Sequence, residues 1–159
     1  DHDDAAQIAQ EKERVYAPML SRDQEGVSPL EMKERLQRLM DEYAGGSSQF
    51  YRANEHQLDY ALRHIKILQS QFKHLRANDL HDLMQANETM DRVDVAEAVV
   101  HHLKARKETR WHSFAENMDY PAKSDDWLKY VNSRKENGEI KIIIRDLVRG
   151  GDSYEHSDK

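Results

Sequence analysis

The chain has 159 residues, of which 38% are hydrophobic and 34% are charged, and its formal net charge is -6. This length fits one domain, and the periodic spacing of the apolar residues argues against a disordered chain. The acidic balance argues against affinity for nucleic acid, and the low content of glycine (6) and proline (3) argues against an all-β fold. No apolar stretch is long enough to insert into a membrane. The absence of cysteine excludes disulfides, zinc–thiolate sites and cysteine nucleophiles, and it favours a cytoplasmic location.

The first two helices predicted along the chain have clear end signals. The first covers about residues 5–16 and is expected to end at Pro18, because proline interrupts a helix. The second begins at Pro29, with Ser28 as its N-cap and Glu31 closing a capping box. The pair Gly45-Gly46 is expected to end it, because glycine enters the left-handed cap conformation without strain.

Two longer amphipathic helices follow. The first starts at Asn54, which forms a weaker capping box with Gln57, and its apolar positions alternate in steps of three and four as far as Leu75. After a break at 76–79, with Asn78 and Asp79 as alternative caps, the pattern continues to about residue 107. A short connection makes such helices antiparallel neighbours. The sequence therefore predicts a mainly α fold, a bundle of three or four helices with two long antiparallel ones.

A β-hairpin is predicted near the C-terminus. Residues 130–134 and 139–147 read as strands around Asn137-Gly138, a pair typical of two-residue hairpin turns. A lone hairpin is only marginally stable, so its isoleucine face should pack on the helices. That face consists of Ile140, Ile142 and Ile144.

The expected domain organisation is one helical domain with its hairpin over residues 1–148, followed by a flexible tail over 149–159. The polar start at Asp1 is expected to be a cut within a loop of a longer protein. Asn87 lies on the seam of the last helix, where two interpretations are open. It is either a polar residue at the rim of the interface or a buried amide that fixes the helix register.

The nine histidines raise the hypothesis of a metal site. His101 and His102 are adjacent and point about 100° apart around a helix, so they do not chelate together. His74 and His81 are able to approach each other across a turn, but no third ligand is indicated. We therefore predict no metal site in this chain.

The densest chemistry follows the last long helix, where charged and large aromatic side chains alternate. A helix C-terminal cap would explain the cations but not the aromatics, and aromatics with arginine on a polar surface are typical of binding hot spots. We expect Glu108 or Asp119 to pair with Arg106 or Arg110, holding the following loop against the helix end; the alternative leaves each charge solvated. The candidate interface residues are Arg106, Glu108, Arg110, Trp111, His112, Asp119, Tyr120, Pro121 and Trp127. No glycine-rich phosphate motif occurs, and we predict neither a catalytic residue nor a cofactor-binding residue here.

This segment carries a family resemblance. The stretch Arg-Lys-Glu-Thr-Arg-Trp from residue 106, then Asp-Tyr-Pro from 119 and Asp-Asp-Trp from 125, resembles the C-terminal helical domain of the fumarate reductase and succinate dehydrogenase flavoprotein family. Residues 29–46 look like the first helix of that domain, and the pattern is closer to the adenylylsulfate reductase alpha subunits than to succinate dehydrogenases. The sequence departs from the family pattern at three points. Thr109 stands where serine is commoner, and the family's second arginine, a few residues before Asp-Tyr-Pro, has no counterpart, because Glu116 or Asn117 occupies that region. In addition, His112 follows Arg110 by two residues instead of three.

The resemblance implies an accessory domain of an FAD-dependent oxidoreductase subunit that is not catalytic alone. Such a domain packs on the flavin-binding domain of the same polypeptide, which holds the FAD, and helps to form the face that meets an iron–sulfur subunit. It implies a cytoplasmic location, at the inner face of the membrane through partner subunits, and the isolated domain is a candidate homodimer. The alternative is a stand-alone helical protein-interaction module without redox activity. Removal from a parent should leave an apolar or aromatic patch larger than monomers usually expose.

Overall fold

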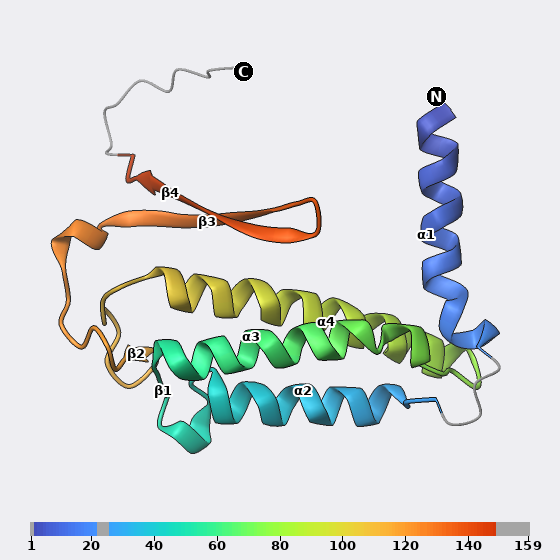
Figure 1. The fold of residues 1–159 in the computed structure, drawn as a ribbon, viewed down its shortest axis with the longest axis horizontal. Coiled ribbons are helices and arrows are strands. Elements are labelled where there is room, and N and C mark those ends of the chain that lie inside the picture. The colour runs from blue at the N-terminus through green and yellow to red at the C-terminus, as the bar shows by residue number, and fades with distance from the viewer. Residues whose placement is uncertain (1, 22–25, 149–159) are drawn as a thin grey trace.

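The computed structural model describes residues 2–21 and 26–148, and it is mainly helical, as predicted (Figure 1). The predicted tail at 149–159 lies outside the described residues. In the described part, no helix is both long enough and apolar enough to cross a membrane. The helices are α1 (His2–Leu20), α2 (Pro29–Tyr43), α3 (Glu55–Ser70) and α4 (Leu80–Ala105), and the strands are β1 (Arg52–Ala53), β2 (Glu116–Asn117), β3 (Lys129–Glu136) and β4 (Glu139–Asp146).

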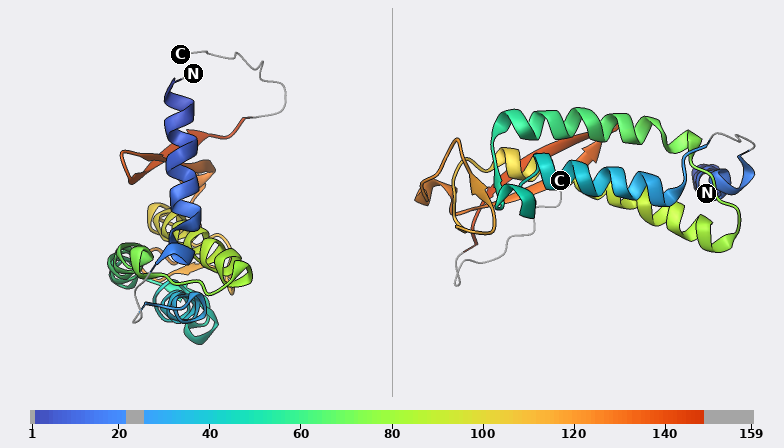
Figure 2. Two further views of the ribbon diagram at one scale, coloured as in Figure 1. Left: turned by 90° about the vertical axis from the view of Figure 1, so that its right-hand side faces the viewer. Right: turned by 90° about the horizontal axis from the view of Figure 1, so that it is seen from below.

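Three helices form the body of the fold. α2, α3 and α4 lie side by side, with α3 antiparallel to both of its neighbours (Figures 1 and 2). Each turns one apolar stripe inward, as the spacing of three and four predicts. The core between them consists of Met32, Leu36 and Leu39 from α2, of Leu58, Ala61, Ile65 and Leu68 from α3, and of Met90, Val93, Ala96 and Val100 from α4.

The predicted N-caps are present at both α2 and α3. Ser28 Oγ accepts a hydrogen bond of 3.1 Å from the Glu31 amide, but the Glu31 carboxylate pairs with Arg35 and does not close the expected box. At α3 the capping box is complete: Asn54 Oδ1 accepts from the Gln57 amide at 2.8 Å, and the Gln57 side chain accepts from the Asn54 amide at 3.3 Å.

The prediction that Pro18 ends the first helix is wrong, because α1 continues through it to Leu20. Proline lacks the amide that would donate to the Arg14 carbonyl, and α1 continues for only two residues beyond it. Pro18 is itself buried, and its carbonyl accepts a hydrogen bond of 2.9 Å from the Ala77 amide. Only this end of α1 meets the bundle, and the rest of α1 rises away from the other helices (Figure 2).

The predicted helix from Asn54 to Leu75 is shorter in the structure, since α3 ends at Ser70. A 3₁₀ turn, Phe72–His74, follows and still places Leu75 in the core with 1% of its surface exposed. The chain that precedes α2 holds this turn, because the Val27 amide donates to the His74 carbonyl at 2.8 Å. Tertiary contacts therefore decide where this helix ends.

The N-cap of α4 is Asp79, one of the two predicted caps, and its side chain accepts a hydrogen bond from the Asp82 amide at 2.8 Å. Asn87, further along α4, is half-buried and faces α1. Its Nδ2 donates to the Val15 carbonyl at 3.1 Å and to the Leu83 carbonyl at 2.9 Å. The residue is half-buried, as a rim position would be, but its Oδ1 is buried, and the two bonds from Nδ2 tie α1 to α4.

The hairpin forms where it was predicted. β3 and β4 pair antiparallel along their whole length, and Asn137 and Gly138 turn between them with φ of 50° and 82°. These positive values at both positions belong to a type I′ turn.

The isoleucine face of the hairpin lies toward α4, as expected. Ser133 is paired with Ile142 and so shares its face, and Ser133 Oγ lies 2.9 Å from His102 Nε2 on α4. Ile140 and Ile142 are half-buried, whereas Ile144 keeps 48% of its surface exposed. The helices thus cover this face incompletely.

The core accounts for most of the stability, and α3 offers a matched pair to test this. Ile65 is fully buried and Ile67 is 48% exposed. Ile65→Ala should lower the free energy of unfolding by about 2–5 kcal/mol because it leaves a cavity. Ile67→Ala should change it by only about 0.5 kcal/mol. Urea titrations of the two variants check this, and equal losses would contradict the helix orientation described here.

Candidate functional site

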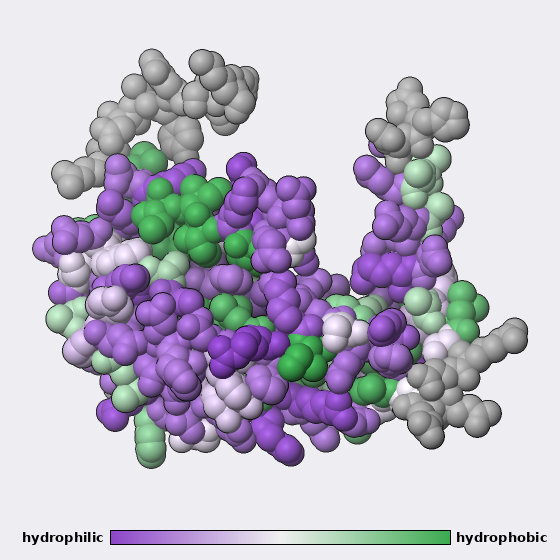
Figure 3. Space-filling model, viewed as in Figure 1, coloured by the Kyte–Doolittle hydropathy of each residue, from purple (hydrophilic) through white to green (hydrophobic). Residues whose placement is uncertain are grey.

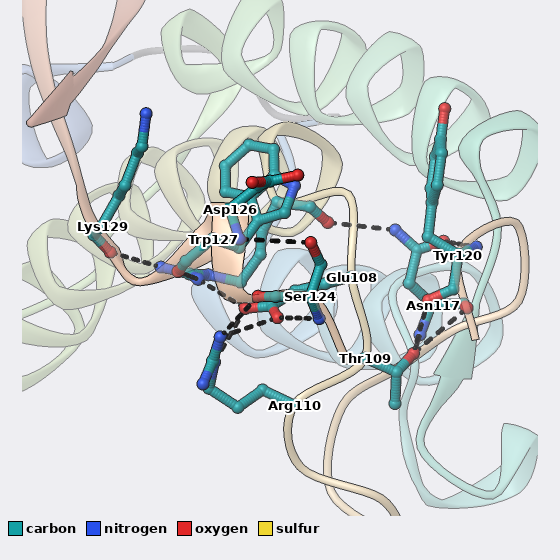
Figure 4. Close-up of polar contacts among 10 residues, drawn as sticks. Glu108, Thr109, Arg110, Asn117, Tyr120, Ser124, Asp126, Trp127 and Lys129 are labelled. Carbon is teal, nitrogen blue, oxygen red and sulfur yellow. Dashed lines mark hydrogen bonds and ion pairs between the residues drawn. The ribbon is translucent and has the colours of Figure 1, made fainter. Parts of the chain in front are cut away.

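A buried carboxylate, Glu108, lies three residues beyond the end of α4. Only 3% of its surface is exposed, and four hydrogen bonds surround it (Figure 4). Its Oε1 accepts from Arg106 Nη1 and Arg110 Nε, both at 2.8 Å. Its Oε2 accepts from Arg110 Nη2 at 2.9 Å and from the Ser124 amide at 3.1 Å. The predicted pairing of Glu108 with the two arginines is therefore present.

Both arginines extend this contact to the chain that follows. Arg106 donates to the carbonyls of Trp127 at 2.9 Å and Lys129 at 3.0 Å, and its guanidinium lies 5.6 Å from the centre of the Trp127 ring. Arg110 donates to the Ser124 carbonyl at 3.0 Å. The end of α4 is thereby tied to the segment that leads into the hairpin. We call Arg106, Glu108 and Arg110 the charge clamp.

The clamp keeps Glu108 ionised. Burial alone would raise the pKa of this carboxyl, because a low dielectric disfavours charge. The hydrogen bonds from Arg110, the Ser124 amide and Arg106 outweigh burial and hold the pKa below its ordinary value. A buried carboxylate with all its acceptor sites occupied fixes the geometry of its partners.

Two side chains outside the predicted interface set, Thr109 and Asn117, hold the loop beyond the clamp. Thr109 is buried, and its Oγ1 accepts from the Asn117 amide at 2.9 Å and bonds to the Tyr120 carbonyl at 3.0 Å. Asn117 donates through Nδ2 to the Arg106 carbonyl at 3.1 Å and accepts through Oδ1 from the amides of Asp119 and Tyr120 (Figure 4). The loop is therefore closed on itself.

Asp119 does not join the charge clamp. Its Oδ2 accepts a hydrogen bond of 2.6 Å from the Glu55 amide in the first turn of α3. A carboxylate is favoured there because the first amides of a helix have no partner within the helix. Asp119 thus connects the loop to α3, and of the two predicted carboxylates only Glu108 binds the arginines.

The other predicted residues lie at the surface of this loop. Tyr120 is 37% exposed, with Lys107 Nζ 5.6 Å from the centre of its ring. Pro121 is exposed next to it. The exposed His112 has its Nδ1 3.8 Å from Glu116 Oε1, and Trp111 is 69% exposed. The structure therefore places most of the predicted set either in the clamp, whose carboxylate is buried, or on an exposed, largely aromatic surface.

A small parallel sheet, which the sequence did not predict, joins this loop to a second one. Residues 52–53 of β1 pair with residues 116–117 of β2, and the amides of Glu116 and Met118 donate to the carbonyls of Tyr51 and Ala53 at 2.9 and 2.8 Å. Strands of two residues have no periodicity to detect, which explains why sequence patterns miss them.

The second loop adds two aromatics that the sequence analysis missed. Phe50 and Tyr51 are 75% and 44% exposed and have φ of 54° and 60°. This left-handed backbone is uncommon for bulky residues and needs support from its surroundings. Asp41 provides it, because its Oδ1 accepts from the Ser48 amide at 3.1 Å and its carbonyl accepts from the Gly46 amide at 3.2 Å.

A groove of about 510 Å³ lies between the two loops and the last turns of α4. Its wall on α4 includes Val95 and Val99, which are 61% and 42% exposed, and its rim carries Trp111, Phe114 and Tyr51. Phe114 is 75% exposed. Large exposed apolar surfaces with polar surroundings mark interaction sites. We call this surface the aromatic groove.

The polar groups near the groove are engaged with one another. Among residues 2–21 and 26–148, no three histidine, aspartate or glutamate side chains come close enough to hold a metal ion. Glu108 and both clamp arginines bind each other and the backbone. The lining of the groove is therefore mostly apolar, and the charged groups of the clamp beside it already have partners.

Comparison with known proteins gives a consistent group of relatives. A family model described as the C-terminal part of the fumarate reductase flavoprotein matches residues 33–150. The adenylylsulfate reductase subunit alpha of Megalodesulfovibrio gigas is 30% identical over 111 residues, which are 69% of this chain and 17% of that protein.

Solved structures agree in fold. Adenylylsulfate reductase from Archaeoglobus fulgidus superposes with a TM-score of 0.85 at 36% identity, covering 91% of this chain and 25% of that one. A variant of the quinol fumarate reductase of E. coli superposes with a TM-score of 0.73 at 22% identity, covering 90% of this chain and 24% of that one. At this identity, the likeness shows the shared fold alone. The chain thus spans about a quarter or less of the length of these relatives.

The charge clamp can be tested by removing its carboxylate. Glu108→Gln should destabilise the segment that follows α4 by about 3–5 kcal/mol, because it leaves two guanidinium groups without their buried counter-charge. Both tryptophans of the chain lie in this segment, so urea unfolding followed by tryptophan fluorescence reports on it. The control is Glu88→Gln, which removes an exposed pair with Arg92 and should cost about 0–1 kcal/mol. Equal stability of the Glu108→Gln variant and the wild type would contradict the clamp.

The lowered pKa of Glu108 also predicts a pH dependence. A carboxyl whose pKa is lower in the folded state contributes stability that is complete above its unfolded pKa of about 4.3. That contribution is lost as the pH falls through the lowered pKa of the folded state. When the free energy of unfolding is measured at decreasing pH, the difference between the wild type and Glu108→Gln should therefore shrink below about pH 4.3. If this difference in unfolding free energy stays constant or grows toward low pH, Glu108 does not have a lowered pKa in the folded state.

Proposed function

The chain belongs to the family of fumarate reductase flavoprotein C-terminal domains, and from this premise we propose that it is the accessory domain of an FAD-dependent oxidoreductase subunit. In this role it packs on the flavin-binding domain of the same polypeptide and contributes no catalytic residue. The identity of 30–36% to adenylylsulfate reductases supports a parent subunit of that type.

The aromatic groove is the observation that carries this proposal. Trp111 and Phe114 line the groove and Phe50 precedes its Tyr51, and the three are 69–75% exposed on loops whose backbones are fixed by buried or multiply bonded side chains. A flexible loop would lose conformational freedom on docking, whereas a fixed one has less to lose. Rigid aromatic anchors are typical of interface hot spots. The large covering partner that such a surface fits is the flavin-binding domain.

The helix N-termini of the bundle support an FAD site outside this chain. A flavin dinucleotide needs free backbone amides for its pyrophosphate, most often at a helix start. In the first turns of these helices, one amide of α2 binds Ser28, two amides of α3 bind Asn54 and Asp119, and one amide of α4 binds Asp79. We accordingly place the FAD in the flavin-binding domain of the parent subunit.

An iron–sulfur partner and a cytoplasmic location follow from the same proposal. The exposed loop with His112, Tyr120 and Pro121 continues from the aromatic groove around the end of the bundle. In the assembled subunit we assign this loop to the side that meets the iron–sulfur subunit. A location at the inner face of a membrane would then come through partner subunits.

The docking role can be measured with the flavin-binding part of the parent subunit expressed separately. Trp111→Ala and Phe114→Ala should each weaken its binding to this chain by about tenfold or more, the effect of an interface hot spot. Both side chains are exposed, so the melting temperature of the free chain should stay unchanged. Leu80 is 70% exposed at the other end of α4, so Leu80→Ala is the matched control and should bind like the wild type. Absence of binding by the wild type, or equal affinity of all three variants, would contradict the proposal.

A further inference from the structure

The hairpin leaves one long β-strand edge open. In the described part of the chain its sheet contains β3 and β4 alone, so the outer edge of β4 has no neighbouring strand. β4 carries four isoleucines within eight residues, and β-branched residues favour strand pairing. Figure 3 shows hydrophobic side chains gathered over the hairpin. A long, apolar and open edge is a template for another strand.

The turn fixes which backbone groups of β4 are free. Glu136 and Glu139 flank the two-residue turn, and this position in a type I′ hairpin is a hydrogen-bonded pair. Bonded and non-bonded pairs alternate along an antiparallel ladder. Every second residue of β4 from Glu139 onward therefore bonds to β3. The amides and carbonyls that point outward belong to Ile140, Ile142, Ile144 and Asp146.

Among these outward positions, the three isoleucines are symmetric about Ile142. We propose that a second copy of this chain adds its β4 to this edge, antiparallel and centred on Ile142. Each Ile140 then bonds to the Ile144 of the other copy, and the two Ile142 residues face each other on the two-fold axis. The result is a four-stranded sheet shared by two copies, with an isologous interface.

The side chains of β4 favour this register over its neighbours. In the register centred on Ile142, Glu139 of each copy lies opposite Arg145 of the other, so two opposite-charge pairs form. Lys141 of each copy lies opposite Ile143 of the other. A shift of two residues toward the C-terminus would place Lys141 opposite Arg145, a like-charge pair that destabilises a sheet. A shift toward the N-terminus would lose the Glu139–Arg145 pairs. Charge complementarity thus selects one arrangement.

The same register covers apolar surface that the monomer leaves open. Ile140, Ile142 and Ile144 of both copies form one continuous strip on the face that lies toward α4. Ile144, which is 48% exposed in one copy, lies beside Ile140 of the other. The β3 edge offers no such match, because Lys129 and Lys135 belong to its outward positions and lysine on an edge opposes pairing.

This interface is separate from the proposed docking of the flavin-binding domain. The aromatic groove is formed by α4 and two loops, and none of its lining residues belongs to β4. Failure of either proposal therefore leaves the other standing.

A charge swap tests the self-pairing. Sedimentation equilibrium of the full chain should show a dimer, and Glu139→Arg or Arg145→Glu should each raise its dissociation constant by about tenfold or more, because two attractive pairs become repulsive. The double variant Glu139→Arg/Arg145→Glu should restore the wild-type constant. Lys129→Glu, a charge reversal on the opposite edge, is the control and should leave it unchanged.

A cross-link tests the same register independently of these charges. The chain has no cysteine, so Ile142→Cys introduces a single thiol at the two-fold axis. Directly opposed Cα atoms in a bonded pair lie about 5.5 Å apart, within the range that a disulfide spans. Oxidation should give a covalent dimer, whereas Ile67→Cys on α3 should not.

Two outcomes would overturn the proposal. If the wild type stays monomeric at high concentration, the edge of β4 does not pair with a second copy, and an extended segment of another chain becomes the alternative partner. A dimer that neither charge reversal weakens, and that Ile142→Cys does not cross-link, would place the interface elsewhere.

Discussion

The structure beyond α4 depends on one buried carboxylate. Glu108 is removed from water at the point where the longest helix ends, and its charge is retained because two guanidinium groups and a backbone amide bind it. An unpaired charge in this position would be costly, so the loss of any one partner destabilises the whole cluster. The arginines in turn bind carbonyls of residues 124, 127 and 129, and the clamp thereby sets the path of the chain from α4 to the hairpin.

This constraint explains why two loops far apart in sequence form one surface. The clamp positions residues 109–118, and β2 in this stretch pairs with β1 next to the Phe50 loop. Asp119 then fixes the first turn of α3. The exposed aromatics of both loops are consequently held by the bundle, although few of their own atoms are buried. Fixed, exposed apolar side chains of this kind are what the proposed docking on a flavin-binding domain requires.

Sequence patterns predicted the elements that depend on periodicity and local caps. The three bundle helices, the Asn54 box and the Asn137-Gly138 turn follow from rules that act over a few residues. The patterns missed what tertiary contacts decide. These are the end of α3 at Ser70, the continuation of α1 through Pro18 and the two-residue strands. They also missed the buried Glu97 on α4, whose Oε1 forms an ion pair of 2.6 Å with Lys66 Nζ on α3. At the site, the alternation of arginine and glutamate predicted the clamp, but no local signal distinguishes Glu108 from Asp119, because their partners lie on different elements.

Amide hydrogen exchange of the wild type and the Glu108→Gln variant tests the central claim most directly, because it reads each segment separately. If the clamp holds the loop surface, exchange in the variant should accelerate at residues 109, 116, 118 and 124, whose amides bond within or across the loops, while the core amides of α2, α3 and α4 stay protected. Faster exchange throughout the bundle, or unchanged exchange in the loop, would contradict the account. The first result would make Glu108 a part of the global core, and the second would show that the loop surface does not need it.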